Sequence, residues 1–295
     1  MNDYLVSVLL GIVEGLTEFL PVSSTAHLRI CEALLGIDLS SGFWKMYSIV
    51  IQLGAILCLP IYFRARIAKF LRTFPRGERG DRTALTHPLT LVFIAFLFTA
   101  VPAFLLTRII GKHLESLSIM GSSLLIGGVI MWIVDALYGS PPADRGYKTE
   151  HMEQVSFGQS IWIGICQIAS AVFPGTSRSM ATIAAGQLAG MSRPSALEFS
   201  FLLSMPTMVA ATAYDLLKTW RPRHAPAGSA LGAMPSNGHE WTILIIGFVV
   251  SLIVALGVVA WFMNWVRRRG FAPFAIYRIL LGIILLGWVF SHHPT

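Results

Sequence analysis

The sequence has few charged residues, and this scarcity excludes an ordinary soluble domain. Asp, Glu, Lys and Arg make up 13% of the 295 residues, and hydrophobic residues make up 55%. The charged share is about half of what soluble domains carry. Three cysteines, Cys31, Cys58 and Cys166, stand alone in apolar segments without a CxxC or Cys/His spacing. We therefore expect neither a disulfide framework nor a zinc site.

Basic residues are missing from the beginning of the chain. No Lys or Arg occurs before Arg29, so the N-terminus lacks the basic region of a cleavable signal peptide, and we expect it to be retained. The formal net charge of +7 comes from basic residues in short loops between apolar runs. This placement favours membrane orientation over binding to nucleic acid.

What the chain does contain is six apolar runs, each near the roughly 20 residues that a helix needs to cross a bilayer. They cover residues 43–63, 89–110, 120–138, 196–217, 241–263 and 273–290. The segments 4–35 and 158–190 each carry a central proline followed by a polar turn, which predicts re-entrant helical hairpins. We expect an all-α polytopic membrane protein with a single integral membrane domain over residues 1–295.

The two hairpin segments resemble each other when the sequence is shifted by 153 positions. The shift superimposes Gly11-Ile12 on Gly164-Ile165, Glu14 on Gln167, Pro21 on Pro174, and Ser23-Ser24 on Thr176-Ser177. This predicts two repeats, about residues 1–140 and 155–295, each with one hairpin and three transmembrane helices. Because three is odd, the second repeat is expected to be inverted, which places a site near the midplane where the repeats meet.

Loop charges predict the orientation, because basic residues gather on the cytoplasmic side. One side carries Arg64, Arg66, Lys69, Arg72, Arg76, Arg79, Arg82, Arg145, Lys148, Arg267, Arg268 and Arg269. The other carries only Lys45, Lys112, Lys218, Arg221 and Arg223. We expect the first side to be cytoplasmic. Both termini and the Pro/Gly/Ser-rich loop 221–239, expected to be flexible, then lie outside.

Glu14 and Glu18 are four residues apart inside an apolar segment, so on a helix both carboxylates project from one face. They are candidates to share a divalent cation such as Mg²⁺ or Ca²⁺, or to pass a proton. The simpler alternative is a pair satisfied by backbone groups or by Arg29. An ionised group at membrane depth costs about 2.5–3.5 kcal/mol, so such a cluster is by default a functional site.

A hydroxyl-rich turn follows Pro21 and contains Ser23, Ser24, Thr25 and then His27. Either Ser24 or His27 is a candidate to attack phosphorus while the other handles the proton, and the sequence does not choose between them. The alternative for His27 is a satisfied core residue. The remaining histidines are interpreted as surface residues at loops and ends: His87, His113, His151, His224, His239, His292 and His293.

Arg178 is the only charged residue between positions 160 and 190, and it lies in the run Pro174-Gly175-Thr176-Ser177-Arg178-Ser179. A guanidinium matches two phosphate oxygens at once, and a Gly lets the backbone approach a ligand. The hydroxyls and freed N–H groups of this turn, with those of the first turn, are the predicted phosphate-binding groups. The alternative is a structural ion pair of Arg178 with Glu14 or Glu18, which a phosphate would partly displace.

With these residues, the chain resembles the undecaprenyl-diphosphate phosphatases of the bacitracin-resistance type, over nearly its whole length. The resemblance rests on Glu14 to His27 and Pro174 to Ser179, supported by Ile51 to Ile56, Glu198 to Leu203 and Pro273 to Arg278. It implies hydrolysis of the polyprenyl diphosphate lipid to undecaprenyl phosphate and inorganic phosphate, which recycles the lipid carrier for peptidoglycan synthesis. It also implies divalent-cation dependence and a site open to the outer side of the bacterial plasma (inner) membrane.

The resemblance assigns Glu14 and Glu18 to the acidic pair, Ser24 and His27 to the nucleophile and acid/base partners, and Arg178 to phosphate binding. Ala26 and Met180 stand where the family pattern usually has Gly, which leaves the shape of the second turn open. A transporter or flippase for a lipid phosphate is the competing interpretation, because broken helices at the midplane are usual in carriers. The oligomeric state stays open, with a homodimer as one alternative.

Overall fold

The computed structural model describes residues 2–37, 42–78, 80–106, 116–140, 146–220 and 232–292. Within these ranges the fold is helical, and the only strand-type pairing is an isolated bridge between Thr149 and Met191. The helices are α1 (Asp3–Thr17), α2 (Ser24–Leu34), α3 (Gly42–Tyr62), α4 (Arg64–Thr73), α5 (Pro88–Leu105), α7 (Leu117–Tyr138), α8 (Phe157–Val172), α9 (Arg178–Leu188), α10 (Arg193–Trp220), α11 (Gly238–Arg269) and α12 (Ala272–His292), with a 3₁₀ turn at Met152–Gln154.

Six of these helices, α3, α5, α7, α10, α11 and α12, are long and apolar enough to cross a membrane. They coincide with the six predicted runs, so the all-α polytopic membrane fold is confirmed. Helix α11 is longer than predicted and ends on Arg267, Arg268 and Arg269, whose charges suit the negative end of the helix dipole. Residues 107–110 of the second run and 221–231 of the loop predicted to be flexible lie outside the described residues.

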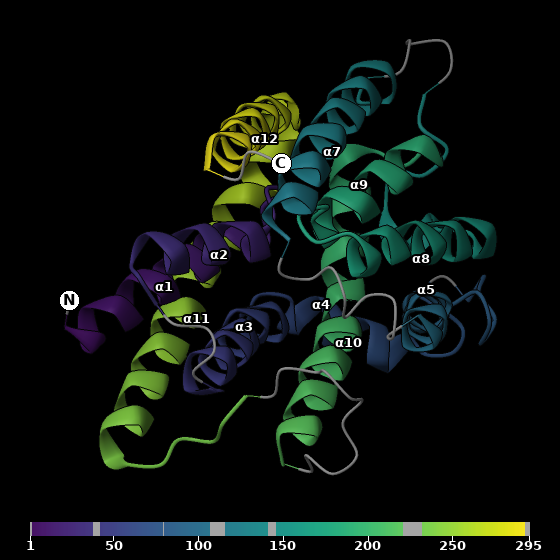
Figure 1. Ribbon diagram of the computed structural model, residues 1–295. Helices are drawn as coiled ribbons and strands as arrows, with labels where there is room; N and C mark the ends of the chain where they lie inside the picture. The colour runs from purple at the N-terminus through teal and green to yellow at the C-terminus, as the bar shows by residue number, and fades with distance from the viewer. Residues whose placement is uncertain are drawn as a thin grey trace.

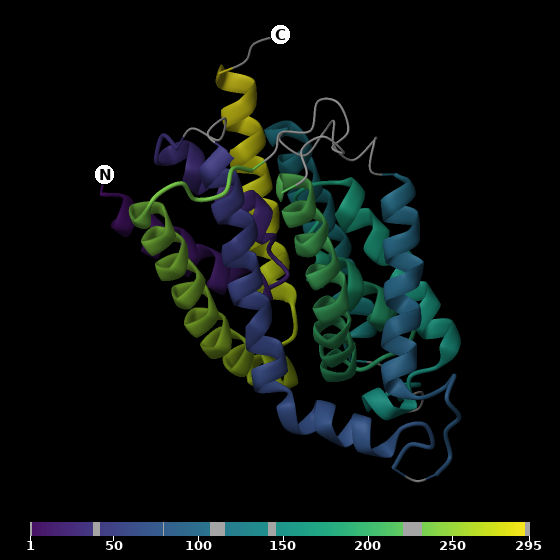
Figure 2. The same ribbon diagram turned by 90° about the horizontal axis from the view of Figure 1, so that it is seen from below.

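Helix α4 was not predicted, because it is short and does not cross the bilayer. It follows α3 directly and turns across one end of the helix bundle (Figure 2). Its Phe70 is buried, and Arg66 pairs with both Glu153 and Glu198, at 2.5 and 2.6 Å. These contacts hold the charged segment against the bundle.

The interpretation of His87 as a surface residue is wrong. His87 caps α5 by accepting a hydrogen bond from the Leu89 amide at 3.3 Å, and its side chain is buried edge-on against Phe70 and Phe74. His151 and His239 are exposed, as expected. The side chains of His113, His224, His292 and His293 lie outside the described part of the chain.

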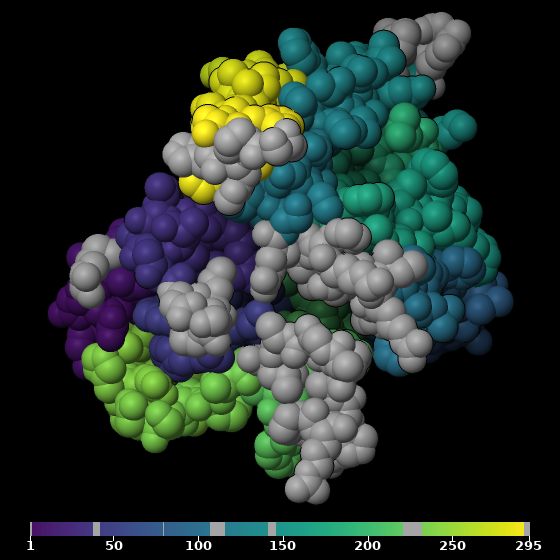
Figure 3. Space-filling model, in the orientation of Figure 1, coloured from purple at the N-terminus to yellow at the C-terminus, as the bar shows by residue number. Residues whose placement is uncertain are grey.

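The helices pack in pairs that join distant parts of the sequence (Figure 1). Helix α12 lies along α7, α11 lies along both α3 and α1, and α5 lies along α8. Helix α10 contacts α3 and α11, and it also contacts α5 and α9. In the space-filling view, the side chains of α12 meet those of α7 at the top (Figure 3). Helix α1 approaches α11 closely at Gly15, which has no side chain. A Cβ at this position would lie 2.7 Å from the Ser251 carbonyl oxygen, too close for any other residue.

The two predicted hairpins appear as pairs of short helices, α1 with α2 and α8 with α9. They contain 15 and 11 residues, and 16 and 11 residues. Each helix is shorter than the roughly 20 residues of a crossing, and Val22, Ser23 and Ser24 at the first turn are buried in the protein. The re-entrant path of the two hairpins through the membrane stays a prediction. The inverted relation between the two halves stays a prediction.

Candidate functional site

The two interhelical turns share an unusual backbone conformation. Ser23 and Ser177 have φ of 75° and 69°, and within the described residues they are the only non-glycine residues with positive φ. Each caps the following helix, because its Oγ accepts a hydrogen bond at 3.4 Å from the amide of Ala26 or Met180. A strained residue of this kind costs on the order of 1–3 kcal/mol and is typical of ligand-binding sites.

The structure corrects the predicted correspondence between the turns. The caps Ser23 and Ser177 are 154 positions apart, whereas the sequence shift of 153 pairs Ser24 with Ser177. The reason is one extra residue between proline and cap in the second turn. Ser24 and Arg178 are therefore equivalent, as the first residues of α2 and α9.

Glu18, at the end of α1, brings the two turns together. Ser24 Oγ donates a short hydrogen bond to Glu18 Oε2, and Arg178 Nη2 donates to Glu18 Oε1 at 3.2 Å. The predicted ion pair of Arg178 therefore exists, with Glu18. It leaves Arg178 Nε and Nη1 buried and without a partner in the described part of the protein. Two N–H donors of the guanidinium are thus available for a ligand.

Arg278 on α12 ties the backbones of both turns. Its side chain is fully buried, and it donates to the carbonyl of Pro21 at 3.2 Å and to those of Gly175 and Thr176 at 3.1 and 2.9 Å. Ser179 Oγ adds a bond to the Leu20 carbonyl at 3.0 Å. Thr176 and Ser179, predicted to bind phosphate, therefore serve in this turn-to-turn contact through the Thr176 carbonyl and the Ser179 hydroxyl.

Beside this junction lies a cavity of about 610 Å³. Its polar end contains Glu18, Ser23, Ser24, Thr25, Gly175, Ser177 and Arg178, which are most of the predicted site residues. Its longer part runs between α5, α8 and α10 and is lined by small or apolar side chains such as Ala100, Ala103 and Ala211, ending near Lys218. A compact anion with an apolar chain matches this division.

Glu14 is fully buried beside Glu18 and Arg178, and it does not line the cavity. Both of its carboxylate oxygens lack a hydrogen-bond partner among the described residues. Arg29, considered as a partner for the acidic pair, instead bonds Glu32 at 3.1 Å. A buried carboxylate without a donor requires a proton or a cation, so Glu14 and Glu18 fit a divalent cation completed by phosphate oxygens. No cluster of three or more His, Cys, Asp or Glu that would hold a metal alone occurs in the described ranges.

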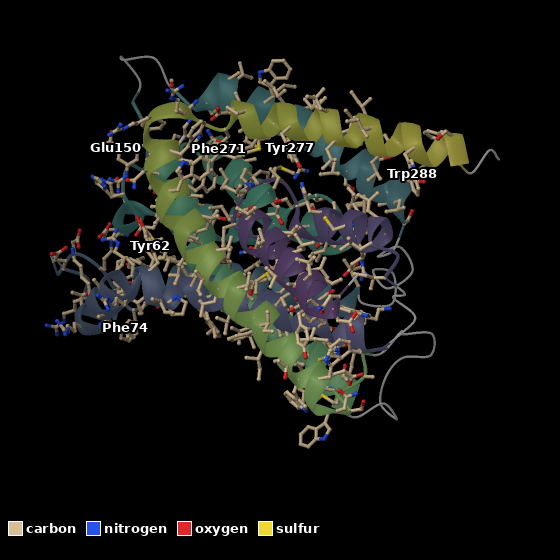
Figure 4. All side chains as sticks on the ribbon, turned by 90° about the vertical axis from the view of Figure 1, so that its left-hand side faces the viewer. Tyr62, Phe74, Glu150, Phe271, Tyr277 and Trp288 are labelled. Atoms are coloured by element: carbon tan, nitrogen blue, oxygen red, sulfur yellow. The ribbon has the colours of Figure 1, made fainter. Side chains whose placement is uncertain are left out.

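His27 does not line this cavity, and both of its ring nitrogens bond residues other than Ser24. Its Nδ1 lies 2.7 Å from the Ser23 carbonyl oxygen, and its Nε2 lies 2.7 Å from the Tyr277 hydroxyl. Because a carbonyl only accepts, Nδ1 carries the proton, and in the neutral ring Nε2 accepts from Tyr277. The two rings are stacked with centroids 5.6 Å apart. Figure 4 shows Tyr277 on α12 between Phe271 and Trp288.

The two departures from the family pattern leave the turns intact. Ala26 and Met180 both lie inside helices, α2 and α9, and their amides donate the bonds to the serine caps. Neither residue is in the positive-φ conformation that favours Gly. Gly175 is different: its φ is 91°, and a Cβ there would lie 2.6 Å from the Met120 carbonyl oxygen.

A family model described as "Bacitracin resistance protein BacA" matches residues 7–284. The chain belongs to the BacA family. A protein named undecaprenyl-diphosphatase from Koribacter versatilis (strain Ellin345) is 69% identical over 288 residues, 98% of this chain and 99% of that protein. Proteins of the same name from Sorangium cellulosum (strain So ce56) and Caldanaerobacter subterraneus subsp. tengcongensis are 42% and 40% identical, over 95% and 94% of this chain and 84% and 93% of theirs.

In this BacA-family protein, sequence reasoning missed the roles of Tyr277 and Arg278. Tyr277 gave no signal, because a tyrosine in an apolar run is ordinary. Arg278 did give one, since it lies inside the predicted crossing 273–290, and a charge at that depth is itself a marker of a functional site.

Proposed function

We propose that this protein is a membrane phosphatase that hydrolyses undecaprenyl diphosphate to undecaprenyl phosphate and inorganic phosphate. One observation carries the proposal: Arg178 lines the cavity beside Ser24 and Glu18, and two of its guanidinium nitrogens are buried without a partner among the described residues, where Ser24 donates its proton to Glu18. A donor pair next to an activated hydroxyl fits a phosphoryl group. The apolar remainder of the cavity fits the start of an isoprenoid chain.

In this reaction Ser24 Oγ attacks the terminal phosphorus, and Glu18 accepts the hydroxyl proton. The bond between that phosphorus and the bridging oxygen breaks, and undecaprenyl phosphate leaves with the bridging oxygen, to which Glu18 passes the proton. Water then cleaves the phosphoserine. Arg178 and the turn amides oppose the charge on the transferred group. The geometry favours Ser24 over His27 as nucleophile, because Ser24 lines the cavity, whereas His27 does not line it and bonds the Ser23 carbonyl and the Tyr277 hydroxyl.

We propose Mg²⁺ or Ca²⁺ as cofactor, held by Glu14 and Glu18. When bound, the cation supplies positive charge that neutralises the diphosphate and lowers the repulsion between the two carboxylates. The support is the pair of unpartnered Glu14 oxygens.

Phosphate release from purified undecaprenyl diphosphate in detergent tests the activity. We expect release by the wild-type protein, loss of release with EDTA, and recovery when Mg²⁺ or Ca²⁺ is added. An Arg29→Lys variant, changed at an ion pair away from the cavity, is the matched control. No release under any metal condition would favour transport of a lipid phosphate and would overturn the proposal.

Glu14→Gln and Glu18→Gln are each expected to weaken the cation dependence. We expect Glu18→Gln to be the poorer single variant, because it also removes the proton acceptor of Ser24. The double variant should be little worse than Glu18→Gln, because the two carboxylates hold one cation together. The measurement is turnover against Mg²⁺ concentration for all four proteins. Fully additive losses would mean that the two carboxylates do not hold one cation together.

Tyr277→Phe is expected to lower turnover modestly. The substitution removes one hydrogen bond to His27 Nε2, worth about 0.5–1.5 kcal/mol, which corresponds to a loss of roughly 2–12-fold. The His27 bond to Ser23 remains and continues to hold the cap. Tyr62→Phe, on the far end of α3, is the control for kcat. Unchanged turnover in Tyr277→Phe would show that the hydrogen bond between Tyr277 and His27 has no role in the reaction.

We propose that the protein lies in the bacterial plasma membrane with the α4 side in the cytoplasm. In a variant without Cys31, Cys58 and Cys166, Ser236→Cys is expected to react with a membrane-impermeant thiol reagent in intact cells, whereas Glu78→Cys reacts only after permeabilisation. Both positions are exposed, so accessibility in the folded protein does not limit labelling. Labelling in the opposite pattern would reverse the orientation.

A further inference from the structure

Gln167 on α8 is a buried polar residue of the same cavity with no task in the chemistry described above. It lines the cavity, and its side chain is 1% exposed. In the sequence shift between the hairpins it corresponds to Glu14, so this helix carries a neutral amide where α1 carries a carboxylate. A buried amide needs partners for both its oxygen and its nitrogen.

The hydrogen bonds around Gln167 fix which way its amide points. Thr207 Oγ1 donates its single proton to the Leu203 carbonyl at 2.8 Å, so towards Gln167 it can only accept. The group 3.1 Å from Thr207 is therefore the Gln167 NH₂. The amide oxygen, Oε1, is left buried and has no partner in the described structure.

An unpartnered buried acceptor costs about 1–3 kcal/mol, so Oε1 is suited to a ligand that brings a hydrogen. Ionised phosphate oxygens only accept, so they suit the unpartnered donors of Arg178 and not the acceptor Oε1 of Gln167. The ligand that the hydrolysis requires and that donates hydrogen bonds is water.

We propose that Gln167 Oε1 accepts a hydrogen bond from the water that cleaves the phosphorylated enzyme. This assignment rests on the proposed hydrolysis. Water has two protons: it gives one to Glu18 as its oxygen bonds to phosphorus, and it directs the other to Gln167. The bond between phosphorus and Ser24 Oγ breaks, and Ser24 Oγ recovers the proton from Glu18. Inorganic phosphate is released.

The proposal makes Gln167 a determinant of whether water or an alcohol takes the phosphoryl group from Ser24. Water has two O–H bonds, whereas an alcohol has only one. Methanol would use that proton for Glu18 and would have none for Gln167. Wild-type protein is therefore expected to prefer water over methanol, and loss of the amide oxygen is expected to reduce that preference.

The experiment measures methyl phosphate and inorganic phosphate formed from undecaprenyl diphosphate in aqueous methanol. In Gln167→Met, which keeps the chain length but loses the amide, we expect the methyl phosphate to phosphate ratio to rise about tenfold, with KM for the lipid nearly unchanged. Thr207→Val, which keeps the amide but removes the partner that orients it, is expected to shift the ratio in the same direction by less. Ser170→Ala, on the same wall, should leave the ratio unchanged; its hydroxyl bonds only the Gln167 backbone carbonyl.

An unchanged product ratio in Gln167→Met, in a protein that still turns over, overturns the assignment. A weaker apparent affinity for Mg²⁺ with an unchanged ratio also overturns it, and would make Oε1 a cation ligand. The absence of turnover by the wild-type protein is a different result, because it contradicts the proposed function itself. A fold control by thermal unfolding in detergent separates loss of the amide from loss of the protein.

Discussion

Ser24→Ala is expected to abolish phosphate release while lipid diphosphate binding persists. The substitution removes the hydroxyl that donates to the Glu18 carboxylate, and Arg178 on the other oxygen of Glu18 remains in place. Removing a nucleophile that works as one unit with its base costs on the order of 10⁴-fold or more in turnover. Turnover and binding of radiolabelled lipid diphosphate are the two measurements.

The Ser24 experiment also decides between the candidate nucleophiles. If Ser24 attacks phosphorus, wild-type protein quenched during turnover yields phosphoserine at this position, and Ser24→Thr retains part of the activity. A kinetically competent phosphohistidine at His27, with residual turnover in Ser24→Ala, would reverse the assignment. Neither adduct, together with a lost activity in Ser24→Ala, would indicate direct attack by water.

The transmembrane helices could be predicted because lipid imposes a length and composition that no tertiary contact overrides. Residues 43–63 and 273–290 read as crossings for that reason, and α3 and α12 follow within a few residues. Helix α4 could not be found in this way. Its stability comes from the burial of Phe70 and the pairing of Arg66 with Glu153, a residue far along the chain.

The prediction of the site is limited in the same way, because contacts between distant parts of the chain decide its geometry. Glu18, Ser24 and Arg178 were predicted from polar residue types in apolar segments, and the structure places them in one hydrogen-bonded group. The predicted correspondence between the two turns was wrong by one residue. The sequence shift aligns the prolines, whereas the helix after each turn begins at its serine cap. The bond of His27 to Tyr277, which lies on α12 and 250 positions later, could not be read from the sequence either.

Arg178→Lys is expected to keep the positive charge and still lose about 10²–10³-fold in turnover. Arg178 directs Nη2 to Glu18, and Nε and Nη1 have no partner among the described residues, so in the proposed reaction one planar group would hold the base and the phosphate in a fixed relation. A lysine has one nitrogen on a flexible stem and satisfies either partner, not both in that geometry.

The measurement for Arg178→Lys is kcat and KM for lipid diphosphate, with Arg29→Lys as the matched control, since Arg29 pairs with Glu32 and neither residue lines the cavity. The loss should appear mainly in kcat, because the guanidinium also holds Glu18 Oε1 and so orients the carboxylate whose other oxygen, Oε2, faces Ser24. Turnover within about twofold of wild type would show that charge alone suffices at this position. In that case Arg178 would be an ion-pair partner of Glu18, and the turn amides would carry the phosphate.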